Sequence, residues 1–393
     1  MGVSACLVVR DEEQSLPHTL KSLAGKVDEI VVAVDSRTTD RTIDVAKAAG
    51  AKTFMVTWSQ CSTCHADDFS SARNLAIEQC TQDWILTIDA DETLVADSLG
   101  FLDKVPSGFD LVLVPVSMRS GEVESARFLG ERLFRRKPDI RYVGVVHHYV
   151  NAAGNARTST NQVVIYHDKG HQPEVRTEAR STQRQRDCIA HLTHMSEGDP
   201  TDTRSRFYLA NTLYSGRNWT EAVKWFVDHI NKAQNSYERY QSAVYCVRVL
   251  THLDRKDEAV QMACQALPWD LRRAELAQML GDLLYGREDY AAARDFYTMA
   301  SAKSYHDSFF WLEPDCYGYM PWLGLTLAYH HLNLPYESLR CAARAHQIKP
   351  DMPLLRQNLE RCRATVTTAE EPPQPAPSVV TPVQASGAKI WAA

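Results

Sequence analysis

Acidic side chains stand at the end of an apolar run in the first quarter of the chain. Asp89, Ala90 and Asp91 follow the segment 84–88 (WILTI), which is typical of a buried β-strand. Two carboxylates at positions i and i+2 can bind one hard cation through their oxygen atoms. Such a cation can hold a diphosphate and neutralise the charge that develops as it leaves. Taken alone, the triplet fits a solvated strand end or a helix cap equally well.

Polar side chains also follow two other predicted strands. Arg10 follows an apolar run at 5–9, and Asp35 follows the run at 29–34. Helical patterns separate these strands, which favours a parallel α/β sheet with helices on both faces. The carboxyl ends of parallel strands meet at one edge of such a sheet, where ligands bind. The other predicted elements are strands at 53–57 and 110–116 and helices at 15–23, 39–49 and 69–79.

Four motifs in this half of the chain resemble those of family 2 glycosyltransferases of GT-A fold. They are VVRDEEQSL at 8–16, VDSRTTDRT at 34–42, FSSARNLA at 69–76 and TIDADE at 87–92. They are similar in order and spacing to that family's N-terminal turn, D-x-S, A-R-N and D-x-D motifs. The resemblance implies an α/β GT-A domain, Rossmann-like with a mostly parallel sheet, over residues 1–190. It also implies an inverting sugar transfer from a UDP-sugar, with Mn²⁺ or Mg²⁺ as cofactor.

The resemblance implies nucleotide-binding roles for the residues that match the family's motifs. Asp35 would bind the uracil base, although a strand-end cap is its alternative role. Arg73 would face the base or the diphosphate, because a guanidinium fork suits phosphate oxygens, and a surface ion pair is its alternative. The full set implied by the resemblance is Arg10, Asp35, Arg73, Asp89, Ala90 and Asp91.

The same positions imply the metal ligands. Asp91 would be the principal ligand, and Asp89 would lie beside the ribose or the metal. A third candidate ligand, His147, lies in the segment 142–149 (YVGVVHHY). Together with ERLFRR at 131–136, this segment resembles a region of bacterial members that carry C-terminal repeats. A purely structural histidine at a strand end is the alternative for His147.

The general base is the least determined part of the expected site. Inversion at an anomeric carbon needs a group that deprotonates the acceptor as it attacks. Glu131 is the first candidate, and His147 and His148 are the next. Since His148 stands where related sequences have glutamate, the role of that glutamate is not carried over.

From about residue 200 the pattern becomes purely helical. Four segments resemble one another, with small residues at matched positions, and two of the intervals lie near the roughly 34-residue period of tetratricopeptide repeats. The last interval is longer and contains an aromatic insert at 304–322. We therefore predict an all-α repeat domain at 195–364, with an irregular helical bundle as the alternative, and a disordered Pro/Ala/Ser/Thr tail at 365–393. The matched positions are Ala222, Ala259, Ala292 and Ser338.

Composition and charge limit the cellular compartment and the classes of partner that we expect. The net charge of −6 argues against a partner bound mainly through phosphates, so nucleic acid is not expected. No apolar stretch reaches the roughly 18 residues of a membrane span, and the N-terminal run turns acidic too early for a signal peptide. A cytoplasmic protein with its ten cysteines as reduced thiols is expected. The segment 61–65 (CSTCH) fits haem attachment, part of a zinc site, or a loop without a ligand, in rising order of expectation.

The expected acceptor is a hydroxyl or thiol of a polypeptide, because repeat arrays bind peptides on a concave face. This domain order resembles that of bacterial peptide or protein S- or O-glycosyltransferases and of lipopolysaccharide-core glycosyltransferases. A cell-surface saccharide or lipid core is the second expectation, and modified nucleic acid the third. Nucleotidyl transfer and a repeat scaffold with an inactive transferase domain are the remaining alternatives. A homodimer formed through the repeats is also expected.

Overall fold

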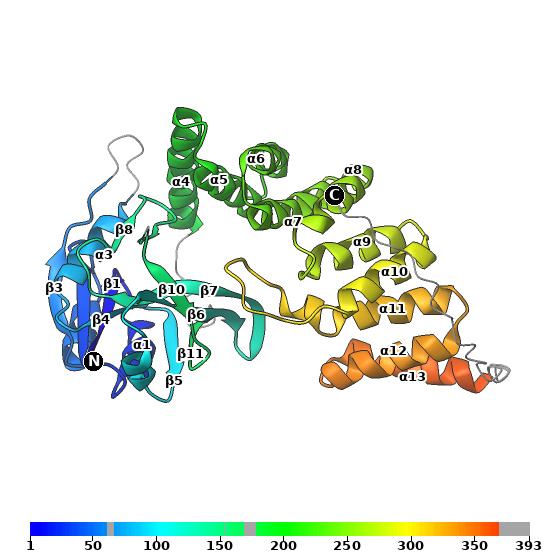
Figure 1. Cartoon of the computed structure of the whole chain (residues 1–393), viewed down its shortest axis with the longest axis horizontal. Helices are drawn as coiled ribbons and strands as arrows, with labels where there is room; N and C mark the ends of the chain where they lie inside the picture. The colour runs from blue at the N-terminus through cyan, green and yellow to red at the C-terminus, as the bar shows by residue number, and fades with distance from the viewer. Residues whose placement is uncertain (61–66, 153, 169–177, 369–393) are drawn as a thin grey trace, which may run out of the picture.

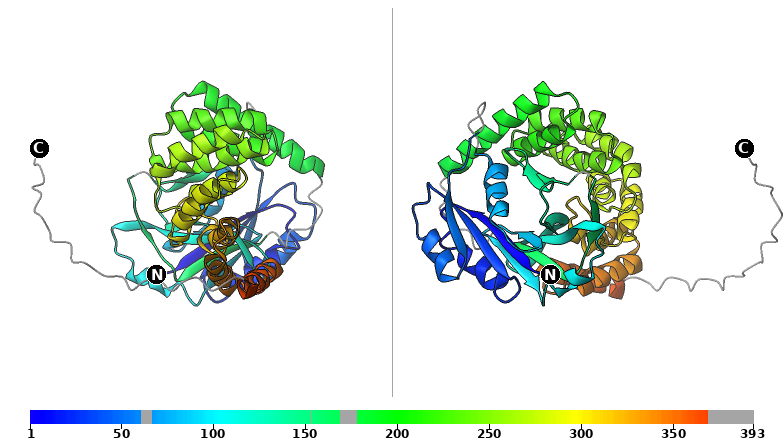
Figure 2. Two further views of the ribbon diagram at one scale, coloured as in Figure 1. Left: turned by 90° about the vertical axis from the view of Figure 1, so that its right-hand side faces the viewer. Right: turned by 60° about the vertical axis from the view of Figure 1, so that its left-hand side comes forward.

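The computed structural model describes residues 1–60, 67–152, 154–168 and 178–368. An α/β part comes first in the chain, and a helical part follows it and curves back toward the sheet (Figures 1 and 2). The segment 61–65 and residues 369–393 of the predicted tail lie outside the described residues, whereas residues 365–368 of that tail belong to a helix.

The sheet of the first part has the strand order β3-β2-β1-β4-β7-β6-β11-β5, and β10 pairs with β6. Strands β1 to β4 are parallel to one another, whereas β7 runs antiparallel to β4 and β6. The predicted mostly parallel α/β fold is therefore confirmed. The strands are β1 (Val3–Val9), β2 (Glu29–Asp35), β3 (Lys52–Val56), β4 (Trp84–Thr87), β5 (Glu92–Ala96), β6 (Phe109–Ser120), β7 (Val123–Arg135), β10 (Ala156–Ser159) and β11 (Val163–Asp168).

Helices cover both faces of this sheet. On one face lie α1 (Leu16–Leu23) and α2 (Thr42–Ala48), followed later in the chain by the short helix η1 (Gly100–Lys104). The apolar side chains of α1 recur at helical spacing and are buried, as an amphipathic helix requires. On the other face lie α3 (Phe69–Glu78) and the small antiparallel sheet of β8 (Arg141–Val143) and β9 (Tyr149–Asn151).

Hydrogen bonds to carboxylates help to fix where α3 and α2 begin, by a side-chain N-cap only in α3. The Asp68 carboxylate accepts the backbone N–H groups of Ser70 and Ser71 at 3.0 and 3.1 Å, so α3 begins at Phe69 as predicted. Helix α2 begins at Thr42, three residues later than predicted. Asp40 accepts the N–H groups of Thr42 and Glu13, at 2.9 and 3.0 Å. These hydrogen bonds hold the turn that precedes α2 against the loop that follows β1.

The second part consists of antiparallel helix pairs stacked side by side. Within the described residues, its α-helices are α4 (Glu178–Gly198), α5 (Thr203–Ser215), α6 (Trp219–Lys232), α7 (Ser236–His252), α8 (Lys256–Ala266), α9 (Glu275–Tyr285), α10 (Tyr290–Ser301), α11 (Met320–His331), α12 (Pro335–Ile348) and α13 (Pro353–Thr368), with short 3₁₀ turns η3 (Leu267–Trp269) and η4 (Pro314–Tyr317). Helix α4 spans the predicted boundary near 190–195, and α13 continues past the predicted end at 364.

One turn recurs in each of the four pairs α5–α6, α7–α8, α9–α10 and α11–α12. The residue two positions before the second helix has a left-handed φ between 55° and 62°. The fourth residue of the second helix is small and almost fully buried, which lets the paired helices approach closely. The repeat prediction is confirmed, with one correction: the third buried position is Ala293 instead of Ala292. The turn residues are Arg217, Asp254, Glu288 and Asn333, and the small residues are Ala222, Ala259, Ala293 and Ser338.

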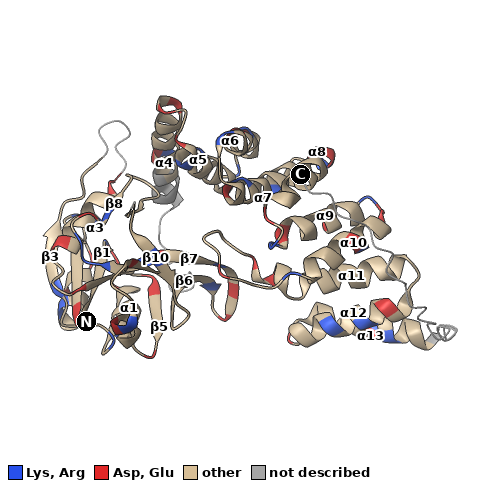
Figure 3. Ribbon diagram, in the orientation of Figure 1, with Lys and Arg blue, Asp and Glu red and all other residues tan. Residues whose placement is uncertain are grey.

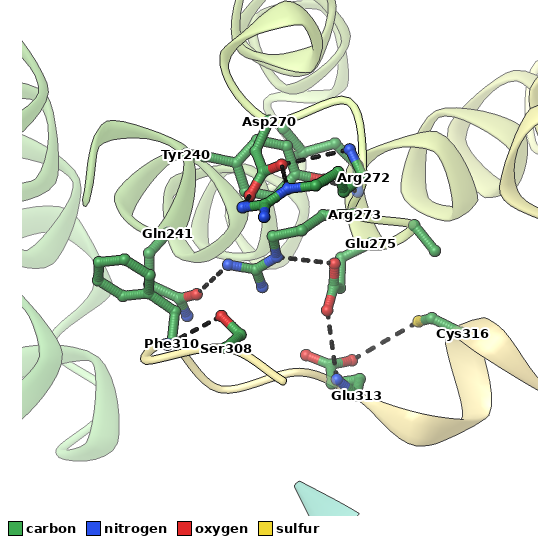
Figure 4. Close-up of polar contacts among 12 residues, drawn as sticks. Tyr240, Gln241, Asp270, Arg272, Arg273, Glu275, Ser308, Phe310, Glu313 and Cys316 are labelled. Atoms are coloured by element: carbon green, nitrogen blue, oxygen red, sulfur yellow. Dashed lines mark hydrogen bonds and ion pairs between the residues drawn. The ribbon is translucent and has the colours of Figure 1, made fainter. Parts of the chain in front are cut away.

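The aromatic insert between α10 and α11 is anchored on a buried ion pair (Figure 4). Arg273 Nε contacts Glu275 at 3.1 Å, and both side chains are only 1% exposed. Arg273 also donates to the backbone carbonyl of Trp311 in the insert at 2.9 Å, and the N–H of Glu313 donates to Glu275 at 3.2 Å. Every charge in this network has a partner, as burial requires.

The insert then pairs with the sheet of the first part. Arg127 of β7 and Leu312 exchange two backbone hydrogen bonds of 3.0 and 3.2 Å, and the N–H of Leu129 donates to the Ser308 carbonyl at 2.7 Å. The ring of Trp311 stacks on that of Phe128, with centroids 5.7 Å apart. The insert is therefore a strand-like bridge from the helical part to β7.

Charged residues are distributed over both parts of the described chain. Figure 3 shows Lys and Arg interspersed with Asp and Glu along the strands and helices of both parts. None of the helices in the described ranges is both long and apolar enough to cross a bilayer. The cysteines outside the segment 61–65 are all free, as predicted, and most are buried.

Candidate active site

The predicted nucleotide-binding residues gather where β1, β2 and β4 end. Arg10 follows β1, Asp35 ends β2, and Asp89 follows β4. Strands β2 and β4 flank β1 in parallel, so their carboxyl ends meet at one edge. The structure thus brings together residues that are about 80 positions apart in the sequence.

A buried carboxylate between two arginines forms the first half of the site. Asp35 is fully buried and pairs with Arg37 at 2.7 Å and with Arg10 at 3.5 Å. Both guanidinium groups also approach Asp67 and lie 5.3–5.5 Å from the centroid of the Trp58 ring. Burial raises the pKa of Asp35, but the hydrogen bonds and charge of Arg37 outweigh it, so the net pKa lies below its usual value. This half of the site offers an ionised acceptor beside planar donors and an aromatic ring.

Two arginines hold the first carboxylate of the acidic triplet in the second half of the site. Arg73, from α3, is 5% exposed and forms a short ion pair with Asp89. Arg132, from β7, lies 3.5 Å from the other Asp89 oxygen and 2.6 Å from Glu92. Burial raises the pKa of Asp89, but the charges of the two arginines outweigh it and hold the carboxyl ionised. In this arrangement, Asp89 is neutralised by guanidinium groups on both oxygens.

The Arg73 guanidinium has a further donor atom, Nη1. Its Nη1 atom is buried and has no hydrogen-bond partner among the described residues. An unpaired buried donor is costly, and sites that bind polar ligands are where such donors are found. Beside it, Asn74 of the same A-R-N motif fixes β8 through two hydrogen bonds with the backbone of Tyr142, at 2.8 and 2.9 Å.

Asp91 lies beside a histidine of β11, the strand that pairs with β5. Its carboxylate is 3.8 Å from Nδ1 of His167, and the same nitrogen is 3.7 Å from Glu92. The contact with Glu92 raises the pKa of His167, and the charge of Asp91 adds to it against the opposing effect of burial. Ala90 is buried between the two aspartates, and the carbonyl of Ala90 accepts the Thr19 hydroxyl of α1 at 2.7 Å.

The adjacent His147 and His148 face different partners. His148 Nε2 accepts a 2.8 Å hydrogen bond from Arg73 Nε, and burial followed by the charge of Arg73 lowers its pKa to about 3. The ring of His147 instead stacks on Tyr208 of α5, with centroids 4.1 Å apart. His148 Nε2 is thus engaged by Arg73, and His147 lies against the helical part and not beside the two aspartates. Their roles as base or metal ligand stay predictions.

Glu131 lies next to Arg132 at a β-bulge. Leu133 pairs with Val112 and Gly130 with Val114, so two residues of β7 stand opposite Leu113 of β6. Bulges re-aim side chains and are common beside active sites. The Glu131 carboxylate forms a 2.8 Å ion pair with Arg157 of β10. Glu131 remains a predicted general base whose orientation is set by Arg157.

Within the described residues, no group of three or more His, Cys, Asp or Glu side chains is arranged to hold a metal ion. Asp91 is the predicted ligand that fits best, because Asp89 is held by arginines and His147 stacks on Tyr208. Mg²⁺ in particular is often held by one or two carboxylates together with substrate phosphates. A separate cavity of about 650 Å³ lies between α1, β5 and β11, and none of the predicted site residues lines it.

Several site residues were missed by the sequence analysis. Arg132 lies in the segment ERLFRR without a predicted role, and His167 lies outside the motifs described above. Arg37 lies inside the VDSRTTDRT motif and Asp67 just before the A-R-N helix. The proximity of Arg132 and His167 to the acidic residues depends on strand pairing, whereas Arg37 contacts Asp35 two positions away in the chain.

Comparison with known families identifies the first part of the chain. Residues 4–151 match the model of Glycosyl transferase family 2. The α/β part is therefore a family 2 glycosyltransferase domain, and the chain combines it with helical repeats of the tetratricopeptide type.

Individual relatives match different lengths of the chain. A TPR repeat-containing protein of Synechococcus elongatus is 40% identical over 153 residues, which is 38% of this chain and 35% of that protein. Glycosyltransferase SunS of Bacillus phage SPbeta is 24% identical over 262 residues, which is 64% of this chain and 57% of SunS. The chain thus spans between about a third and somewhat over half of these two relatives. Among solved structures, MamA covers 46% of this chain and 96% of its own, at 13% identity and a TM-score of 0.37.

Proposed function

We propose that this protein is a metal-dependent, inverting glycosyltransferase that moves a sugar from a UDP-sugar to a hydroxyl or thiol of a polypeptide. The observation that carries the proposal is the Arg73–Asp89–Arg132 cluster beside Asp91, within a family 2 glycosyltransferase domain. The match to glycosyltransferase SunS supports the proposal, because that alignment spans 262 residues, whereas the family model matches only residues 4–151.

The two halves of the site suit the two ends of a nucleoside diphosphate. Ionised Asp35 can accept hydrogen bonds from the N–H of a uracil ring, and Trp58 lies near the arginines that flank it. Arg73 offers a buried donor, Nη1, whose geometry suits a phosphate oxygen. A nucleoside diphosphate with its base beside Asp35 and its diphosphate beside Arg73 would occupy both halves of the site.

Asp91 is the residue that would hold the divalent cation, Mn²⁺ or Mg²⁺, together with the diphosphate. When bound there, the cation would neutralise negative charge on the leaving group. Arg73 would add to that stabilisation from a site whose charges are already fixed in place by ion pairs. Glu131 would take the acceptor proton, and its ion pair with Arg157 would orient it.

The helical repeats support a polypeptide as acceptor. They stack beside the transferase domain and curve toward it, which is the shape that repeat arrays use to bind extended chains (Figure 2). A saccharide or lipid-core acceptor is the second proposal. A cytoplasmic location and a homodimer formed through the repeats remain predictions.

The proposal is tested by a thermal-shift screen of nucleoside diphosphates and nucleotide-sugars with Mg²⁺ or Mn²⁺. A ligand that binds only the folded state raises the melting temperature by mass action. We expect UDP and UDP-sugars to raise it in the presence of the cation, and GDP and ADP to raise it less. An equal shift with all diphosphates would contradict the uracil assignment, and no shift with any of them would contradict the function.

A further inference from the structure

The segment 144–149, which joins β8 to β9, lies between the transferase domain and the helical repeats. It turns sharply, with left-handed φ values of 94° at Gly144 and 49° at His147. A non-glycine residue adopts that conformation only where surrounding contacts hold it there. The contacts that hold this segment come from both parts of the molecule.

On the repeat side, the helical part contacts Val146, His147 and Tyr149 of the segment, the last two through helix α5. Val146 packs against the hydrophobic core of the repeats. The ring of His147 stacks nearly parallel on Tyr208, at 12° between planes. Arg204 donates to the backbone carbonyl of His147 at 3.1 Å and lies over the ring of Tyr149 at 4.2 Å.

On the transferase side, the next residue reaches the candidate site. His148 accepts the Nε hydrogen bond of Arg73, and its ring lies edge-on to Tyr142 at 5.2 Å. Arg73 uses its other atoms to pair with Asp89 and offers Nη1 to a ligand. The orientation of the guanidinium plane therefore depends on His148 at one corner and Asp89 at another.

We propose that helix α5 is part of the donor-binding site, and that Tyr208 is a positioning residue which acts through His147 and His148 on Arg73. This inference rests on the proposed function, because it assigns the nucleotide to the site that Arg73 serves. It assigns the repeats a role in donor binding that is independent of any role in acceptor binding.

The test compares Tyr208→Ala with Tyr208→Phe and with the matched control Tyr290→Ala. Tyr290 stacks on His331 of the repeats in the same way, with centroids 4.3 Å apart and 8° between planes, but belongs to α10, far from the segment in the chain. Two quantities are measured on the full chain without acceptor: hydrogen exchange of the backbone amides in 144–149, and the affinity for UDP with Mn²⁺.

We expect Tyr208→Ala to speed exchange of this segment and to weaken UDP binding by about 2- to 30-fold, the range of coupling energies seen between linked sites. Tyr208→Phe keeps the ring and should restore both quantities, and Tyr290→Ala should change neither. Unchanged exchange and affinity in Tyr208→Ala would overturn the inference, as would equal effects of Tyr290→Ala. If the unmodified protein binds no UDP, the proposed function fails, and unchanged exchange in Tyr208→Ala would separately overturn the structural role of α5.

Discussion

At the scale of single residues, two histidines of the candidate site have pKa values shifted in opposite directions. His148 is buried beside the positive charge of Arg73, which lowers its pKa to about 3. His167 contacts Glu92 and Asp91, and its pKa is raised above its usual value of 6.5. The pKa values differ because His148 is buried and lies beside the cation Arg73, whereas His167 contacts the anions Glu92 and Asp91.

These shifts predict opposite contributions to stability as pH changes. Below pH 6.5 the unfolded chain binds a proton at His148 that the folded protein does not, so this group's contribution falls as pH falls from 6.5 toward 3. The contribution of His167 is complete below pH 6.5 and is lost as pH rises through its raised pKa. Urea unfolding between pH 5 and 8 measures both.

We expect His148→Gln to flatten the slope between pH 5 and 6.5 by up to about 1 kcal/mol per pH unit. His167→Gln should leave that slope and flatten the fall above pH 6.5. Since each variant is the control for the other, identical pH profiles of the two variants would contradict the assignment of charges in the site.

At the predicted site, Arg10, Asp35 and Asp89 follow parallel strands and lie at one edge of the sheet, as that pattern predicts. Arg73 comes from α3 and pairs with Asp89 there. Sequence reasoning placed these residues together, and their roles stay predictions. It did not recover Arg132 or foresee that Asp89 would be neutralised by two arginines. That requires knowing that β7 inserts antiparallel beside β4, a pairing between residues 47 to 51 positions apart that local periodicity does not encode.

At the scale of secondary-structure elements, the packing of α9, α10 and α11 depends on two glycines. Tyr297 of α10 lies between Gly281 of α9 and Gly324 of α11. A Cβ atom at either glycine would stand 2.4–2.5 Å from the Tyr297 ring, well inside contact distance. The Tyr297 hydroxyl also donates to Asp282 at 2.9 Å, which fixes the ring and prevents it from moving aside.

We therefore predict that Gly281→Ala lowers the free energy of unfolding by about 1–3 kcal/mol, as overpacking of a close-fitting core does. Gly198→Ala is the control, because nothing lies within 4 Å of the added methyl group at the end of α4. That change should leave stability unaltered or raise it by up to about 1 kcal/mol. The midpoint of urea unfolding measures both, and a Gly281→Ala protein as stable as the control would show that the three helices are packed less tightly.

The repeats illustrate what could be predicted of elements from sequence. Recurring small residues located all four helix pairs, because close helix approach demands them. The third pair was misaligned by one residue, since the run 291–293 (AAA) offers three equivalent alanines and only Ala293 is fully buried. The left-handed residue in each turn was not predicted, because the four positions are occupied by Arg, Asp, Glu and Asn, not by glycine.

At the scale of the whole molecule, two contacts of the described repeats with the transferase domain lie next to candidate site residues. Helix α5 receives His147, which precedes His148 in the chain. The insert pairs with Leu129 and Arg127 of β7, the strand that carries Arg132. The buried Arg273–Glu275 pair ties the insert to the repeats (Figure 4). The domain order was predictable from sequence, but these contacts were not, because the insert was recognisable only as an aromatic interruption of the repeat.

The central claim is that Asp91 and its neighbours bind a nucleotide-sugar with a divalent cation. The most direct measurement is the rate of UDP release from UDP-sugars, with and without Mn²⁺, by the unmodified protein, by Asp91→Asn and by Asp44→Asn. Asp44 is an exposed carboxylate on α2 and controls for a loss of charge. We predict that Asp91→Asn loses the Mn²⁺-stimulated rate by about 10- to 100-fold while Asp44→Asn retains it. An Asp91→Asn protein with the full Mn²⁺-stimulated rate would contradict the account.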